Sequence, residues 1–225
     1  MLAGRTVKLA ALAAGATMLL AGCGTHPGAA AVVESQTISH DQVDDVALAV
    51  CSANLAAAQM SNQPPPTIAT RESREVALGI LIDTELSHQY GEREGIEPNP
   101  REVSEAVAQN EAGLGMLPPD RREVFRTTLR DYAAGQLILI EAGRADIGDE
   151  ATEEEAINRG VELRQEYVDT IDVEVDPRYG RFEEGRFQRG GAALSVPASD
   201  DAVAGDQDRP GDAFVGRLPA SQQCS

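Results

Sequence analysis

Residues 29–42 read AAAVVESQTISHDQ and predict a short strand, a turn and the start of a helix. The strand is the apolar part, residues 29–34. Ser39 then has the position of a helix cap, because its hydroxyl can accept a hydrogen bond from the Gln42 amide while the Gln42 side chain reaches back. Apolar residues continue at helical spacing over residues 43–59, which predicts the first helix.

Four more helices are predicted along the chain. Three of their starts have a polar cap residue with a glutamate three positions later. The predicted helices run from Thr70 to Tyr90, with Gly91 as the stop, and begin after Asn99, Asp120 and Thr152. The first of these is apolar on two sides, which indicates a central, buried helix. Residues 113–119, rich in glycine and proline, are predicted to be a loop.

The period of the apolar residues changes near the end of the helical region. Val173 and Val175 alternate with acidic residues, which predicts a short strand. The economical arrangement pairs residues 30–33 with residues 171–175. We therefore expect a mainly α fold of about five helices, with a short two-stranded pairing of the N-terminal and C-terminal segments. Residues 190–225 are rich in glycine, alanine, aspartate and proline, a composition that predicts a mostly disordered, low-complexity tail.

The first 22 residues predict a secretion signal. A basic start precedes an apolar run at residues 9–20 that is too short to span a bilayer permanently. The letters LAGC, ending at Cys23, have the form of a bacterial lipobox, in which the cysteine receives diacylglycerol before cleavage. Two acyl chains anchor a protein stably. We therefore expect residues 23–29 to be a lipidated tether on the outer face of the cytoplasmic membrane, and residues 30–189 to be the folded domain.

The charge and the scarcity of histidine argue against several kinds of site. The formal net charge of −18 becomes −20 once the two basic residues of the signal are removed. Such an acidic chain is unsuited to nucleic acid, whose affinity depends on phosphate neutralisation. No Walker or dinucleotide glycine motif occurs, and three histidines and three cysteines are too few and too scattered for a zinc cluster. His40, His88 and the acidic run 153–155 are therefore interpreted as surface residues, and no cofactor is expected beyond the lipid on Cys23.

Cys51 and Cys224 are the two cysteines outside the lipobox. An even count in an oxidising compartment predicts a disulfide, which would staple the tail to the first helix. The alternative is a buried free Cys51 and an exposed free Cys224.

Met60, Leu114, Met116 and Leu117 are the candidates for a peptide-binding surface. Flexible methionines on an exposed apolar surface suit contact with varied peptides. Packing of these four residues against the core is the alternative interpretation.

The segment DPRYG at residues 176–180 is the most motif-like in the chain. Its proline and glycine set a turn, and Arg178 and Tyr179 can reach neighbouring carboxylates or carbonyls. We interpret the segment as a structural closure rather than as a ligand site.

Three stretches together resemble the SurA N-terminal domain family: residues 31–39, the GIEP of residues 95–98, and residues 175–180. The lipobox followed by HPGAAAVV at residues 26–33 is similar to SurA-like lipoproteins of high-GC Gram-positive bacteria. The resemblance covers approximately residues 29–180. It implies a mostly helical chaperone domain whose end segments pack together and whose apolar surface holds unfolded exported polypeptides.

Many members of that family carry a parvulin prolyl isomerase domain before the closing segment. Only a few residues separate Val168 from Val175 here, and all three histidines lie earlier in the chain, so no isomerase activity or other catalysis is expected. The function that the resemblance implies is that of a membrane-anchored lipoprotein that holds exported polypeptides or assists their folding. An envelope adaptor or scaffold that binds one specific partner is the alternative.

Overall fold

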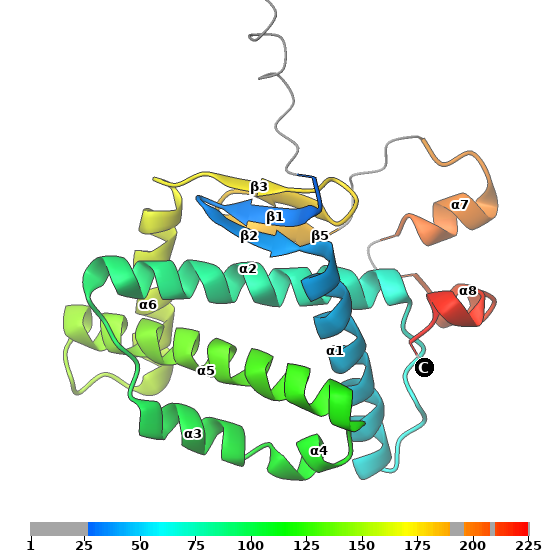
Figure 1. Cartoon of the computed structure of the whole chain (residues 1–225). Coiled ribbons are helices and arrows are strands. Elements are labelled where there is room, and N and C mark those ends of the chain that lie inside the picture. Colours follow the sequence, from blue (N-terminus) through cyan, green and yellow to red (C-terminus); the bar gives the residue numbers. More distant parts are fainter. Residues whose placement is uncertain (1–26, 190–195, 208–209, 225) are drawn as a thin grey trace, which may run out of the picture.

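The computed structural model describes residues 27–189, 196–207 and 210–224, and within these ranges the fold is mainly helical, as predicted (Figure 1). The helices of the main body are α1 (His40–Met60), α2 (Thr70–Glu94), α3 (Pro100–Ala108), α4 (Glu111–Gly115), α5 (Pro119–Ile147) and α6 (Glu153–Val168). The strands are β1 (Ala29–Val33), β2 (Gln36–Ser39), β3 (Val173–Val175), β4 (Gly180–Glu183) and β5 (Arg186–Arg189). Near the C-terminus follow α7 (Asp200–Gly205), α8 (Asp212–Val215) and a short 3-10 helix, Ala220–Gln222.

The start of α1 follows the predicted capping signal. The Ser39 hydroxyl accepts a hydrogen bond from the Gln42 amide at 3.1 Å. The Gln42 side chain, expected to reach back to Ser39, lines a surface groove instead. The inward side of the helix buries Val43, Val46 and Ala47.

The central helix is α2, as its two-sided apolar pattern predicts. Leu78, Ile82 and Leu86 are all buried. The prediction that Gly91 stops the helix is wrong: α2 runs on to Glu94 and is capped by Gly95, whose φ of 69° is a left-handed conformation that suits glycine. Gly91 is a packing position instead, because a Cβ there would lie 2.9 Å from Ile138.

Two of the remaining helix caps were predicted correctly and one was not. Asn99 caps α3 by accepting from the Arg101 amide at 3.0 Å, and Thr152 and Glu155 form a reciprocal capping box at the start of α6. Asp120 is not the cap of α5, which begins at Pro119 and holds Asp120 in its first turn. Proline suits that place because the first helical N–H has no partner within the helix.

The loop predicted at residues 113–119 is partly helical, because α4 occupies its first residues. Leu114 and Leu117 are 1% and 3% exposed. The Arg122 guanidinium donates to the carbonyl oxygens of Leu114, Gly115 and Leu117 at 2.9, 3.1 and 2.9 Å. An arginine of the next helix therefore supplies hydrogen bonds to the carbonyl groups at the end of α4. The local glycine-rich pattern does not predict this order.

The strand β1 is the middle of an antiparallel sheet in the order β2-β1-β3. Its register with β3, Val33 opposite Val173, confirms that the two ends of the domain meet as predicted. The expected two strands are three, because β2 also pairs with β1. A second pair of strands, β4 and β5, places Phe182 opposite Phe187 and was not predicted.

The sheet and the other long helices pack around the central helix α2. The three-stranded sheet lies across one side of α2, and α1, α5 and α6 pack on its other sides (Figure 1). The core between them includes the fully buried Val33, Val43, Leu78 and Leu139.

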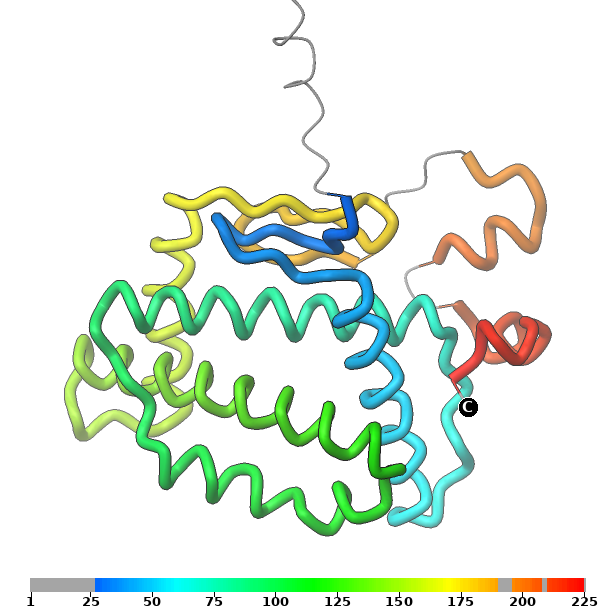
Figure 2. The backbone as a smooth tube through the Cα atoms, in the orientation of Figure 1, coloured from blue at the N-terminus to red at the C-terminus, as the bar shows by residue number. Residues whose placement is uncertain are grey.

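The last described residues, 210–224, form what we call the C-terminal strap. It is joined to α1 by a disulfide between Cys51 and Cys224, whose Cα atoms are 5.6 Å apart, as predicted. The Cys224 amide donates to the Ile68 carbonyl at 2.9 Å, and Val215 is fully buried. Figure 2 shows the strap beside the start of α2. The prediction of disorder is therefore wrong for the strap, because the disulfide, the hydrogen bond and the buried valine hold it in place although its composition is typical of disorder.

Residues 1–26 lie outside the described ranges, so the predicted signal, the lipobox and Cys23 have no structural counterpart to compare. In the part of the chain that the structure describes, no helix combines the length and the apolar character that crossing a membrane requires.

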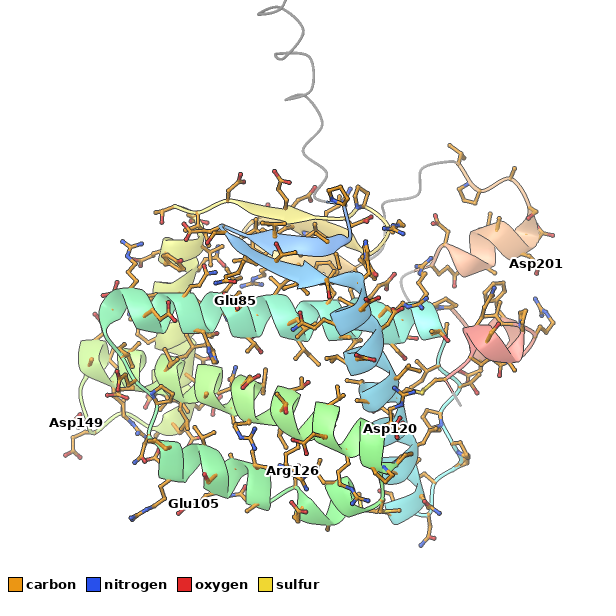
Figure 3. The ribbon with its side chains drawn as sticks, viewed as in Figure 1. Glu85, Glu105, Asp120, Arg126, Asp149 and Asp201 are labelled. Atoms are coloured by element: carbon orange, nitrogen blue, oxygen red, sulfur yellow. A yellow bond between two sulfur atoms is a disulfide. The ribbon has the colours of Figure 1, made fainter. Side chains whose placement is uncertain are left out.

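Acidic side chains are spread over the periphery of the molecule. Glu105, Asp149 and Asp201, on three different parts of the chain, are all exposed and point outward (Figure 3). Glu153 and Glu154 occupy the first turn of α6, where negative charge interacts favourably with the helix dipole.

Candidate functional site

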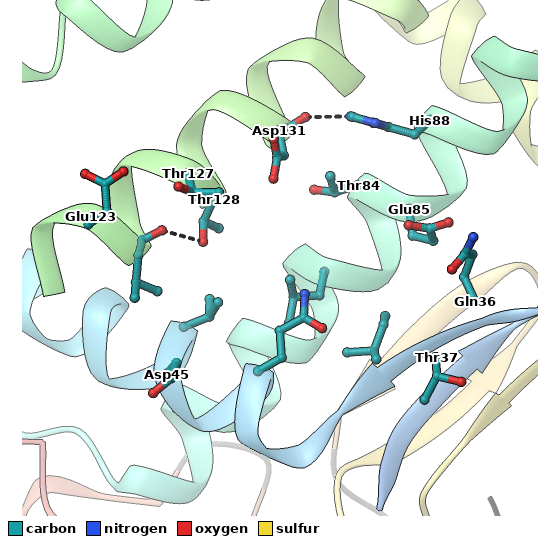
Figure 4. A pocket seen from close by; sticks show the side chains of 15 residues that line it. Gln36, Thr37, Asp45, Thr84, Glu85, His88, Glu123, Thr127, Thr128 and Asp131 are labelled. Atoms are coloured by element: carbon teal, nitrogen blue, oxygen red, sulfur yellow. Dashed lines mark hydrogen bonds between the residues drawn. The ribbon is translucent and has the colours of Figure 1, made fainter. Parts of the chain in front are cut away.

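A groove lies on the surface between β2 and three helices, and we call it the β2 groove. Its volume is about 830 Å³, within the range of about 300–1,000 Å³ that is usual for ligand sites. Figure 4 shows it bounded by side chains from β2, α1, α2 and α5. Its lining comprises Gln36, Thr37, Ile38, Gln42, Asp45, Val46, Leu81, Thr84, Glu85, His88, Glu123, Val124, Thr127, Thr128 and Asp131.

The floor of the β2 groove is apolar. Ile38 and Val46 are buried members of the core, and Leu81 and Val124 are partly buried residues packed against it. One floor residue comes from each of the four bounding elements, so the packing of the sheet on the helices creates the floor. An occupant would find fixed apolar surface there.

The rim of the β2 groove is acidic. Its charged side chains are Asp45, Glu85, Glu123 and Asp131, and the described residues that line it include no arginine. Glu85 accepts a hydrogen bond from Gln89 at 2.8 Å, and Glu123 pairs with Arg126 at 3.3 Å.

Two of these rim carboxylates are open to an occupant. Among the described residues, the side chains of Asp45 and Asp131 have neither an ion pair nor a hydrogen bond, and both residues are exposed. His88, interpreted from sequence as a surface residue, donates from Nε2 to the Asp131 main-chain oxygen, 2.9 Å away, and so bridges α2 and α5. The oxygen is a main-chain acceptor, so the ring nitrogen is the donor. The Asp131 carboxylate itself remains available.

One side of the β2 groove is the edge of a sheet. Strand β2 is the outer strand in the order β2-β1-β3. In β1, residues 30 and 34 direct their main-chain bonds to β3, since Asp176 donates to the Ala30 oxygen and the Glu34 amide donates to Asp172, both at 2.9 Å. Because bonding direction alternates along a strand, Ala31 and Val33 face β2.

This alternation decides which way Thr37 points. Ala31 and Val33 are paired with Ile38 and Gln36, and Thr37 lies opposite Val32. The N–H and C=O of Thr37 are therefore directed away from β1, toward the groove that Thr37 lines. No strand lies beside that edge in the described part of the chain.

A second cavity, of about 480 Å³, lies between α2 and the β4–β5 hairpin and differs in charge. Its lining includes Arg164, Arg186 and Arg189 with the acids Glu75 and Asp83. Arg164 is already paired with Asp83 at 2.6 Å. Glu75 is 2% exposed and pairs with Arg71 at 2.9 Å, and burial raises the pKa of its carboxyl despite the opposing effect of Arg71. Both acids of this cavity are therefore paired, Asp83 with an arginine of the lining and Glu75 with Arg71 beside it.

His40 and the DPRYG segment meet in what we call the closing cluster. Arg178 Nη2 donates to His40 Nε2 at 2.9 Å, and His40 Nδ1 lies 3.0 Å from the Tyr179 hydroxyl. Arg178 also binds the Asp176 carboxylate, at 2.6 Å for the shortest contact. These hydrogen bonds with Arg178 lower the pKa of Asp176, and burial raises the pKa of the Tyr179 hydroxyl. The predicted reach of Arg178 to a neighbouring carboxylate is confirmed.

The predicted peptide-binding residues divide into two kinds. Leu114 and Leu117 are buried, which leaves them in the alternative role of core residues. Met60 and Met116 are 52% and 41% exposed. None of the four lines the β2 groove.

The sequence analysis missed the residues that make up the β2 groove. They come from four elements, of which α2 and α5 are distant in the chain from β2 and α1, and each residue belongs to an ordinary helix or strand face. The one local signal is the alternation of exposed Thr37 with buried Ile38, which is typical of a strand with one face exposed. Among the described residues, no group of three or more histidine, cysteine or acidic side chains is placed to hold a metal ion.

Comparison of the chain with family models, with curated proteins and with solved structures finds no match. The geometry of the β2 groove and the resemblance of three sequence stretches to the SurA N-terminal domain family are therefore the grounds for a function.

Proposed function

We propose that this chain is a lipid-anchored extracytoplasmic protein that holds unfolded exported polypeptides without catalysing a reaction. The observation that carries the proposal is the β2 groove, an open hollow of about 830 Å³ with an apolar floor. An unfolded chain exposes apolar side chains, and their burial on such a floor is favourable at about 25 cal/mol per Å².

The composition of the groove suits a holding role. Its lining combines apolar residues with threonine and glutamine side chains, which offer hydrogen bonds to a main chain of any sequence. The resemblance to the SurA N-terminal domain family supports the same proposal. The predicted signal and lipobox add the location, outside the cytoplasmic membrane.

The experiment is suppression of aggregation of a reduced, unfolded client by the purified full chain at stoichiometric ratio. Thr127→Trp places a large side chain in the groove from an exposed position of α5 and should abolish most of the suppression. Glu141→Trp, at an exposed position of the same helix outside the groove, is the matched control and should retain it. Thermal unfolding of both variants checks that they fold.

Two outcomes would contradict the proposal. The first is a wild-type chain that does not suppress aggregation; together with a single partner captured by cross-linking in the envelope, it would favour the adaptor. The second is acceleration of a proline-limited refolding reaction by the chain, which would show catalysis.

A further inference from the structure

We propose that the occupant of the β2 groove is an extended segment bearing lysine or arginine, added as a strand to the open edge of β2. The inference rests on the proposed function and names the class of polypeptide segment that the groove selects. Two independent observations carry it: the main-chain edge at Thr37 and the charge of the rim.

The main-chain edge determines the conformation of the occupant. The Thr37 N–H and C=O face the groove, and within the described residues neither has a hydrogen-bond partner. An unpaired strand edge is a template for another strand, and peptides bind such edges through main-chain hydrogen bonds. An extended segment beside β2 would supply the acceptor and the donor that Thr37 lacks.

The rim determines the charge of the occupant. Four carboxylates surround the groove, and neither lysine nor arginine occurs among the described residues that line it. Figure 4 shows Glu85 on the side of the groove where β2 runs, with Glu123 and Asp131 on the α5 side. Like charges that face one another repel, so a cationic side chain between them is favoured and an acidic one is disfavoured.

Lysine and arginine match the floor as well as the rim. Both side chains lay an aliphatic stem along apolar surface while the charged end stays in a polar environment. In the groove, the stem would lie over Leu81 and Val124 and the charge would reach Asp45 or Asp131. Side chains alternate between the two faces of a strand, so every second residue of the segment points into the groove.

The test uses short fluorescein-labelled peptides in which threonine alternates with lysine, norleucine or glutamate, with binding measured by fluorescence anisotropy on the full chain. The lysine peptide should bind more tightly than the norleucine peptide, and the glutamate peptide should bind most weakly. Of the three peptides, only the lysine peptide should bind more weakly when salt is added, because salt screens the exposed rim charges.

Matched variants separate the rim from net charge. Asp45→Asn with Asp131→Asn should weaken binding of the lysine peptide about fivefold and leave the norleucine peptide unchanged. Glu105→Gln with Asp149→Asn removes the same charge at exposed positions outside the groove and should leave both peptides unchanged.

Main-chain pairing is tested by N-methylation of the lysine peptide, either at every threonine or at every lysine. Only alternate N–H groups face β2, so one series should lose binding and the other should keep it. Equal binding by the two series overturns the strand pairing, and equal binding of the lysine, norleucine and glutamate peptides overturns the charge selection. Those results leave polypeptide holding intact if Thr127→Trp still abolishes binding, whereas no binding by any peptide counts against the proposed function itself.

Discussion

Two glycines determine how closely α5 and α6 approach each other. A Cβ at Gly143 would collide with the main chain of Ala156, and a Cβ at Gly160 would collide with the main chain of Leu139. The obstacles are backbone atoms, which cannot rotate out of the way as a side chain can. The contact therefore depends on the absence of a side chain at both positions.

We expect Gly160→Ala to lower the free energy of unfolding by about 3 kcal/mol, because the helices must separate to admit the methyl group. Urea unfolding followed by circular dichroism measures the change. Gly115→Ala is the control: a Cβ there has no neighbour within 4 Å, so the variant should be as stable as the parent or slightly more stable. Equal effects of the two substitutions would show that helix propensity, not the α5–α6 contact, determines the result.

The closing cluster gives a prediction that depends on pH. Hydrogen bonds with Arg178 lower the pKa of Asp176 in the folded protein, so its ionised form stabilises the fold. This contribution is complete above the unfolded pKa of about 3.9 and is lost as the pH falls through the lower folded value. Asp176→Asn should therefore destabilise the protein by about 1 kcal/mol at neutral pH, a modest figure because Arg178 is largely exposed.

Urea unfolding of wild type and Asp176→Asn across the acid range measures this dependence. The difference between them should shrink as the pH falls below about 3.9. Glu183→Gln, which removes a carboxylate whose ion pair with Arg181 is half-exposed on both sides, should have little effect at any pH. A constant difference between wild type and Asp176→Asn at every pH would mean that the ionisation of Asp176 does not contribute.

The helices and strands that the sequence predicts correctly are those whose signals lie within a few residues of one another in the chain. Ser39 and Thr152 cap α1 and α6 by contacts within three residues, so the sequence contains the whole interaction. The β4–β5 hairpin also has a local signal, the two-residue turn Glu184-Gly185 between the paired residues Glu183 and Arg186. The order of α4 was not predictable in this way, because it depends on Arg122 in the next helix.

The candidate site was less predictable than the fold for the same physical reason. Asp131 is far in the chain from Thr37 and Asp45, and the three residues meet only because the sheet and three helices pack around the groove. Each has an unremarkable local setting at an exposed position. The order of the strap does not follow from the composition of residues 190–225, because it depends on the disulfide to Cys51 and on the burial of Val215.

The strap is expected to depend on its disulfide. Replacing Cys51 and Cys224 by serine removes a crosslink that spans 173 residues, which the chain-entropy model values at about 5 kcal/mol as an upper bound. The variant should unfold at lower temperature and lose the strap first to limited proteolysis. A reducing agent should reproduce the effect in wild type and change nothing in the variant, whereas two free thiols in the mass of the unreduced wild type would exclude the crosslink.

At the scale of the whole molecule, α2 separates two surfaces of different character. The β2 groove has an acidic rim with open carboxylates, whereas the cavity under the β4–β5 hairpin is lined by three arginines and by two acids that are already paired. The strand β1 is the first element of the described chain. It lies in the sheet that forms one edge of the groove (Figure 1). A lipid on Cys23 would be only six residues from Ala29, a reach of about 20 Å when extended. The sheet and the groove would therefore lie close to the membrane surface.

The anchor itself is tested by Cys23→Ser. A serine cannot receive the thioether-linked diacylglycerol that the predicted lipobox places on Cys23. We expect the variant to appear in the medium or to remain as an unprocessed precursor, measured by fractionation and intact mass. Cys224→Ser also removes one cysteine but leaves the lipobox whole, so it should stay with the membrane at mature size. If Cys23→Ser is retained there at mature size, the anchor lies elsewhere, and the position inferred for the β2 groove beside the membrane loses its basis.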